Sequence, residues 1–241
     1  MFISGNYSSD NYNSDNLMSD YVEFLQSLLL IVSNFFLLPA VYLALKCKYL
    51  GEAFIYFLTM FCSSFYHLCD NDHMRYCIIN YEVLQFCDFY SAILTLWVTA
   101  ILMSDIPYEW RSVLHLTGSL FFAGLLRSKT TGAISFVVPA VCSLVLLGLS
   151  WVYQCYCMRI MPSSLSYSNL IPGAVLGVIG AVMFVSQVTI FGHLYGYTHS
   201  GWHICMSLSI SFLLPKTLLN QYHCPQYFDT LDILPTSKFD I

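Results

Sequence analysis

Two histidines near the C-terminal end of this 241-residue chain have the spacing of a metal-binding pair. His199 and His203 are four residues apart in the stretch Tyr197-Thr198-His199-Ser200-Gly201-Trp202-His203. On a helix this spacing places both imidazole rings on one face, one turn apart. Two imidazoles placed in this way can bind one Zn²⁺, which needs at least one further protein ligand.

A second polar group lies in the stretch Ser63-Ser64-Phe65-Tyr66-His67-Leu68-Cys69-Asp70. Ser63 and His67 are again four residues apart, and Asp88 follows at the start of the next apolar run. We predict a Zn²⁺ site of His67, His199 and His203, with a bound water whose pKa falls to about 7. Asp88 is the candidate general base or ligand-orienting residue, and Ser63 the candidate hydrogen-bond donor to an oxyanion or to the water.

Each of these residues also has an ordinary structural interpretation. A single histidine in an apolar helix is more often a packed, hydrogen-bonded residue than a ligand, so the prediction depends on three of them converging. Asp88 could stabilise a helix start, Ser63 could bond to its own helix, and Asp70 is better explained as a helix-end residue. The remaining histidines lie in expected loops or near helix ends, and we assign them no role in the site. They are His73, His115, His193 and His223.

The composition indicates that such a site would lie among helices that cross a membrane. The chain is 57% hydrophobic and only 10% charged, whereas soluble domains carry about 25% charged residues. Its continuous apolar runs fit helices that cross a bilayer and do not fit the alternating segments of a membrane barrel. The sequence has no basic patch, which argues against nucleic acid as a partner. Its polar N-terminus lacks the basic and apolar regions of a cleavable signal peptide.

We therefore predict an all-α, polytopic membrane protein with a polar extracellular tail at 1–20, a seven-helix transmembrane domain at 21–219 and a cytoplasmic tail at 220–241. The seven expected spans are Tyr21–Leu45, Gly51–Cys69, Val83–Met103, Val113–Leu126, Ala133–Gln154, Ile171–Phe191 and Tyr197–Leu219. Pro39 is expected to kink the first span.

The loops predict an orientation. With the N-terminus outside, six Lys and Arg residues fall on the inner side and three on the outer side, which follows the positive-inside rule. The end of the second span and the starts of the third and seventh then lie in the outer leaflet. His67, Asp88, His199 and His203 should consequently share one depth, where lipid amide and ester bonds are within reach.

Several smaller features carry predictions of their own. Cys69 and Cys77 flank an outer loop, where an oxidising environment would allow a disulfide. The sequon at Asn6 could be glycosylated, and the juxtamembrane cysteines Cys155 and Cys157 could be lipidated, with Cys224 a further candidate. The small-residue pattern of the sixth span, Gly173, Gly177 and Gly180, predicts a close helix contact within one chain or between two copies.

Three stretches together resemble one protein family, that of myomaker and its larger relatives, which include a GPI-anchor-processing phospholipase. They are EAFIYFLTMFCSSFYHLCD at 52–70, LQFCDFYSAILTLWVTA at 84–100, and YTHSGWH at 197–203 with LLP at 213–215. The family is similar to a wider group of seven-span, zinc-dependent lipid hydrolases that includes alkaline ceramidases and adiponectin-type receptors. The resemblance implies zinc at His67, His199 and His203, Ser63 and Asp88 at the group's serine and aspartate positions, and a pair formed by Cys69 and Cys77.

Two functions follow from this resemblance. The short polar N-terminal segment resembles the short family members that drive fusion of myoblasts, which implies a plasma-membrane protein acting on lipid bilayers, alone, as a homo-oligomer or with a partner fusogen. The retained Ser63 and Asp88, and a tail without a cysteine-rich end, depart from the pattern of the vertebrate short members. They favour the alternative, a zinc-dependent lipid hydrolase of the outer or lumenal leaflet, in the plasma membrane, the Golgi or another secretory membrane.

Overall fold

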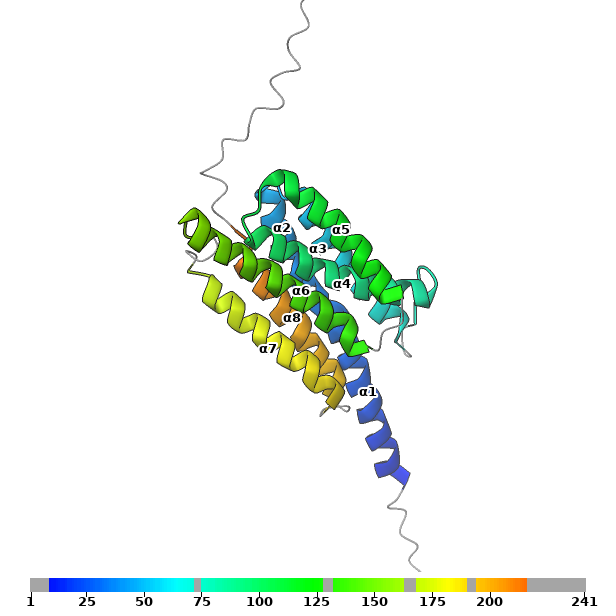
Figure 1. Cartoon of the computed structure of the whole chain (residues 1–241). Coiled ribbons are helices and arrows are strands. Elements are labelled where there is room, and N and C mark those ends of the chain that lie inside the picture. Colours follow the sequence, from blue (N-terminus) through cyan, green and yellow to red (C-terminus); the bar gives the residue numbers. More distant parts are fainter. Residues whose placement is uncertain (1–8, 72–74, 128–131, 163–167, 190–193, 216–241) are drawn as a thin grey trace, which may run out of the picture.

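A computed structural model describes residues 9–71, 75–127, 132–162, 168–189 and 194–215, and all elements in these ranges are helices (Figure 1). They are α1 (Ser9–Ser33), η1 (Asn34–Leu37), α2 (Leu38–Lys46), α3 (Leu50–Cys69), α4 (Tyr81–Met103), α5 (Tyr108–Arg127), α6 (Gly132–Tyr153), η2 (Gln154–Met158), α7 (Leu170–Thr189) and α8 (Tyr195–Leu213). The all-α prediction is confirmed for these residues, and each expected span coincides with a helix or with the continuous run from α1 to α2.

The first helical run shows the expected effect of Pro39. The chain passes from α1 through the short 3₁₀ turn η1 into α2, and Pro39 is the second residue of α2. Proline has no N–H to donate, and its ring clashes with the carbonyl of the residue four before it, which is Phe35. The Phe35 carbonyl instead accepts the N–H of Leu38 in the tighter 3₁₀ pattern. The helix also begins earlier than the span, at Ser9.

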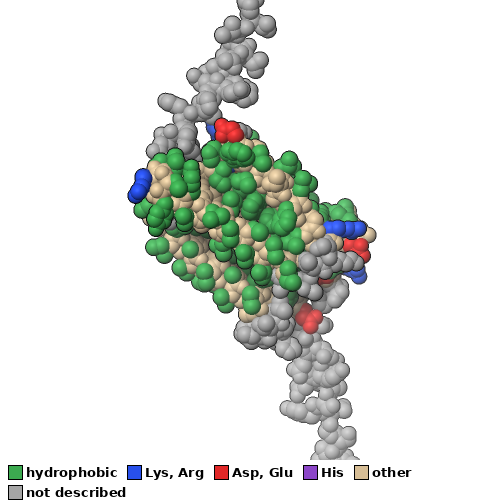
Figure 2. Space-filling model, in the orientation of Figure 1, with side chains coloured by type: hydrophobic (Ala, Val, Ile, Leu, Met, Phe, Trp, Pro, Cys, Tyr) green, Lys and Arg blue, Asp and Glu red, His purple; other side chains and the backbone are tan. Residues whose placement is uncertain are grey.

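Four helical stretches are long and apolar enough to cross a membrane. They are Tyr21–Lys46, Tyr81–Met103, Ile134–Met158 and Leu170–Gln187. The face in Figure 2 is covered by hydrophobic side chains, and charged side chains lie near its edges. An apolar surface of this extent is typical of a protein in contact with lipid. The chain is therefore a membrane protein.

Helices α7 and α8 pack closely because α7 presents glycines to α8. Cβ atoms added at Gly173 and Gly180 would approach Leu213 and Met206 to 2.8 and 3.0 Å. Between them, Gly177 lies opposite Ser209, whose hydroxyl donates to the Gly173 carbonyl at 2.7 Å. The predicted small-residue contact is thus within one chain, and it holds α8 in place against α7.

Helices α3 and α4 are joined by hydroxyl pairs. Tyr56 and Thr99 are 2.9 Å apart at their side-chain oxygens, and Thr59 and Thr95 are 2.8 Å apart. Beyond α3, a disulfide links Cys69 to Cys77, as predicted. The hydroxyl pairs join the first half of α3 to α4, and the disulfide constrains the end of α3 that carries the predicted site residues.

Candidate metal centre

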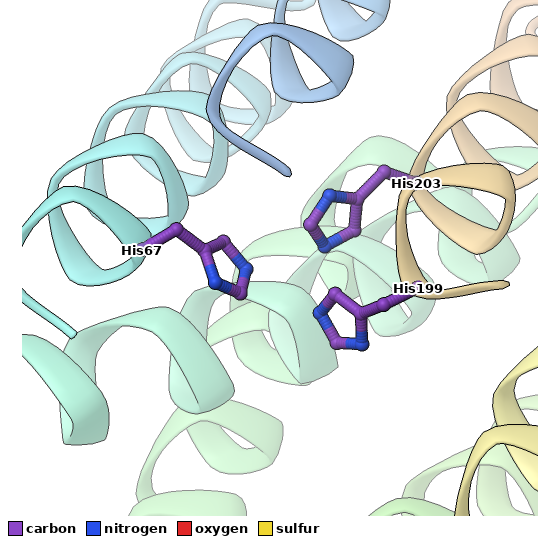
Figure 3. Close-up of side chains that lie close together, drawn as sticks. All are labelled: His67, His199 and His203. Carbon is purple, nitrogen blue, oxygen red and sulfur yellow. The ribbon is translucent and has the colours of Figure 1, made fainter. Parts of the chain in front are cut away.

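Three histidines from two helices meet inside the bundle. His67 comes from the last turn of α3, and His199 and His203 come from successive turns of α8 (Figure 3). The ring centroid of His67 lies 5.0 Å from that of His199 and 5.2 Å from that of His203. One nitrogen from each ring lies within 4.8 Å of the other two, and all three residues are buried. The predicted convergence is confirmed, and the cluster could hold a metal ion.

Hydrogen bonds orient two of the rings. His199 Nδ1 lies 2.7 Å from Oε1 of Gln187 on α7. An amide oxygen only accepts, so Nδ1 carries the proton and Nε2 keeps its lone pair. His203 Nδ1 lies 3.0 Å from the Ser33 hydroxyl, which itself donates to the Leu30 carbonyl at 2.9 Å. The serine proton is therefore used, His203 Nδ1 must donate, and its Nε2 also keeps a lone pair.

The third ring, that of His67, has a nitrogen without a hydrogen-bond partner among the described residues. This atom, Nε2, is buried. Leaving a buried polar atom unpaired costs about 1–3 kcal/mol. Three imidazoles with Nε2 available are a donor set that suits Zn²⁺, and catalytic zinc sites often have three protein ligands and one open position. The residues present thus fit a metal ion.

Ser63 and Asp88 form a separate pair beside the cluster. Both side chains are buried, and the Ser63 hydroxyl lies near enough to the Asp88 carboxyl to interact with it. Asp88 does not belong to the set of mutually close metal-binding atoms found among the described residues. Because Ser63 lies one turn before His67 on α3, the pair and the cluster occupy neighbouring turns of the same end of the bundle.

Aromatic rings surround the histidines. Tyr195 stacks on His199 with ring centroids 5.0 Å apart. Trp202 lies 5.0 Å from His199 and 4.9 Å from His203, and Tyr66 lies 5.2 Å from His67. These rings limit the access of water on several sides, which strengthens electrostatic interactions inside.

Sequence reasoning missed Ser33 and Gln187, the two partners of the histidine Nδ1 atoms. A signal was present, since each is a polar residue in an apolar stretch of the sequence, and such residues in membrane helices usually have a function. In the structure both are buried. Among the other candidates, Asp70 caps α3 and accepts a hydrogen bond from Tyr81 at 2.9 Å, as expected of a helix-end residue. His115 lies 3.2 Å from Glu52. Glu52 is in the first turn of α3, whereas His67 is in the last turn, so His115 does not belong to the cluster.

The structure does not test the predictions for the remaining residues. His73, His193, His223, Asn6 and Cys224 lie outside the described residues. Cys155 is half-buried and Cys157 exposed, and both are free thiols, so their lipidation stays a prediction. Roles for Ser63 and Asp88 in catalysis also stay predictions.

The chain is similar in sequence to one protein family and to several named proteins. A family described as "Protein of unknown function (DUF3522)" matches residues 23–204. Post-GPI attachment to proteins factor 6 of Mus musculus is 35% identical over 193 residues, which are 78% of this chain and 25% of that protein. Transmembrane protein 8B of Homo sapiens is 33% identical over 209 residues, 84% of this chain and 43% of that protein. Protein myomaker of Danio rerio is 27% identical over 188 residues, 77% of this chain and 84% of that protein. The chain thus spans less than half of the first two relatives.

Proposed function

We propose that this chain, which belongs to the DUF3522 family and is similar to protein myomaker, is a seven-span plasma-membrane protein with a zinc centre in the outer leaflet. Seven helical stretches, with α1 to α2 counted as one, lie where the spans are expected among the described residues. Three of them, α3, α5 and α8, are less apolar than the four clear spans. In α3 and α8 the polar side chains face the bundle, as membrane helices with functional groups require.

Hydrolysis of lipid amide or ester bonds is the function that this geometry supports best. The observation that carries it is the buried cluster of His67, His199 and His203 beside the Ser63–Asp88 pair. When bound there, Zn²⁺ would supply a Lewis acid and lower the pKa of a coordinated water. Asp88 would hold a proton taken from the attacking water, and Ser63 would orient the Asp88 carboxyl.

The test uses the full chain purified in detergent. We expect close to one zinc per chain in the wild type and far less in His203→Ala, measured by elemental mass spectrometry. Wild-type protein should release fatty acid from lipid substrates, measured by lipid mass spectrometry, and Asp88→Asn should lower the rate at least about a hundredfold while retaining zinc. Zinc near zero in the wild type would refute the centre. Zinc with no product from any amide- or ester-linked lipid would refute hydrolysis.

A second function is promotion of myoblast fusion, and the overlap with 84% of Danio rerio myomaker favours it. The partners would then be the lipids of apposed cells, a second copy of the chain or a separate fusogen. Expression in non-fusing cells mixed with myoblasts tests it, with surface display measured in parallel. Mixed syncytia formed by wild type and by Asp88→Asn alike would assign fusion without hydrolysis. An absence of syncytia at good surface display would refute the fusion function.

A further inference from the structure

Ser64 of α3 has a buried hydroxyl without a hydrogen-bond partner among the described residues. The residue is 9% exposed. A serine inside a membrane helix commonly donates to the carbonyl four residues earlier, and Ser119, Ser200 and Ser211 do so in this protein. Since a buried hydroxyl left unpaired costs free energy, the Ser64 hydroxyl is available to a bound group.

Ser64 borders the histidine that also lacks a partner. It precedes His67 by three residues, so the two side chains are neighbours on one face of α3, with Cβ atoms about 5–6 Å apart. Side chains of a helix lean toward its N-terminus, which places the His67 ring over the turn that contains Ser64. A potential metal ligand, His67 Nε2, and a hydroxyl donor are therefore both buried and unpaired within one turn, as judged from the described residues.

Ser63 and Ser64 face different neighbours, because successive side chains of a helix are about 100° apart. The Ser63 hydroxyl lies near the Asp88 carboxyl of α4, which can accept its proton. Ser64 is turned away from that contact. The two adjacent serines thus lie on two sides of the His67 ring.

Contacts before and after Ser64 show what it faces. Met60, one turn earlier on the same face, belongs to one core cluster with Leu37 at the end of η1. Asn71, two turns later and just after α3, lines a cavity together with Leu30 of α1. Ser64 therefore faces the stretch of α1 and η1 that lies between Leu30 and Leu37.

The other serines beside the histidines have already used their protons. Ser33, in the stretch that Ser64 faces, donates within its own helix and accepts from His203. Ser200, between the two histidines of α8, donates to the Gly196 carbonyl at 2.6 Å. Of these serines, Ser64 is the one that keeps a proton to donate.

We propose that the Ser64 hydroxyl donates a hydrogen bond to the oxygen of the ligand that completes the metal centre, which is a water or the carbonyl oxygen of a lipid amide or ester. The inference rests on the proposed function and adds a contact to its substrate. The two serines then have separate roles, since Ser63 holds the Asp88 carboxyl and Ser64 holds the ligand oxygen. Such a donor stabilises the negative charge that develops on a carbonyl oxygen under attack.

The test compares two probes on full-length, zinc-loaded protein in detergent, by isothermal titration calorimetry. Octanohydroxamic acid binds zinc through oxygen, and octanethiol binds it through sulfur, which is a weaker hydrogen-bond acceptor. Ser64→Ala should weaken hydroxamate binding about tenfold, as expected for one lost hydrogen bond to a charged oxygen, and should leave thiol binding nearly unchanged. Ser64→Thr keeps the hydroxyl and should retain hydroxamate binding.

Ser143→Ala is the matched control. Ser143 of α6 is likewise buried, with a hydroxyl that lacks a partner among the described residues. It lies about two turns after Phe136, which contacts Trp202 beside the histidines. From there α6 continues to Trp151, whose indole donates to the Met103 carbonyl at the far end of α4. The variant should therefore bind both probes like the wild type.

Size-exclusion profiles and retention of the Cys69–Cys77 disulfide report folding of each variant. Unchanged hydroxamate binding in folded, zinc-loaded Ser64→Ala would overturn the proposal and leave the metal centre standing. Equal weakening of both probes would overturn it as a general loss of packing. Zinc-loaded wild type that binds neither probe would also overturn it, because the centre would then have no open position.

Zinc content and lipid hydrolysis separate this proposal from the proposed function. A wild type without zinc would refute both. Zinc binding with a hydroxamate affinity that depends on Ser64, but without release of fatty acid, would support the contact and refute only hydrolysis.

Discussion

Gln187→Leu tests whether the hydrogen bond to His199 Nδ1 prepares the metal centre. The bond is 2.7 Å long and joins two buried side chains. Leucine is similar in size to glutamine but offers no acceptor, so the buried Nδ1–H is left unpaired. The ring can then take its other tautomer, which places the proton on Nε2 and removes the lone pair that a metal requires.

Loss of such a supporting bond typically lowers metal affinity 10- to 100-fold, which corresponds to about 1.4–2.7 kcal/mol. We expect Gln187→Leu to fall in this range. Gln187→Glu keeps an acceptor at the same position and should bind Zn²⁺ at least as tightly as the wild type. Competition with a chromophoric zinc chelator, in detergent and at fixed pH, measures the dissociation constants.

Gln154→Leu is the control, since Gln154 lies after α6 and bonds to Ser104, away from the histidines. It should leave zinc affinity unchanged. The reasoning fails if Gln187→Leu stays within about twofold of the wild type. It also fails if Gln154→Leu weakens zinc binding as much as Gln187→Leu does, because the effect would then be a general loss of packing.

Three further predictions concern stability, each measured by thermal unfolding in detergent. Gly118→Ala should destabilise by about 1–3 kcal/mol, because its Cβ would overlap the Trp97 indole, whereas Gly124→Ala has open space and should change little; equal effects would refute the packing argument. Cys69→Ser should cost about 2.5 kcal/mol by releasing the short loop closed by Cys77, and an unchanged midpoint would show that the cross-link adds nothing. Removing zinc with a chelator should lower the midpoint and re-added zinc should restore it; no shift would argue against a metal in the folded state.

Local patterns in the sequence were sufficient to predict the helices and the three histidines. Long apolar runs predict membrane helices, and the spacing of His199 and His203 fixes their shared face. The positions of Ser33 and Gln187 against the histidines could not be predicted, because helix rotation and pairing depend on contacts such as those between the α7 glycines and α8. The pairing of Ser63 with Asp88 is likewise a tertiary contact between α3 and α4 that spacing within one helix cannot show.

The division of the histidines between α3 and α8 has a consequence for how the protein is made. His67 is synthesised early, whereas His199 and His203 belong to the last helix among the described residues. A nascent or truncated chain without α8 retains one of the three ligands and lacks the ring pair that would clamp an ion. Under the proposed zinc centre, metal would bind only after α8 has docked, so the metal content of the protein in a cell would report the fraction of chains in which α8 is in place.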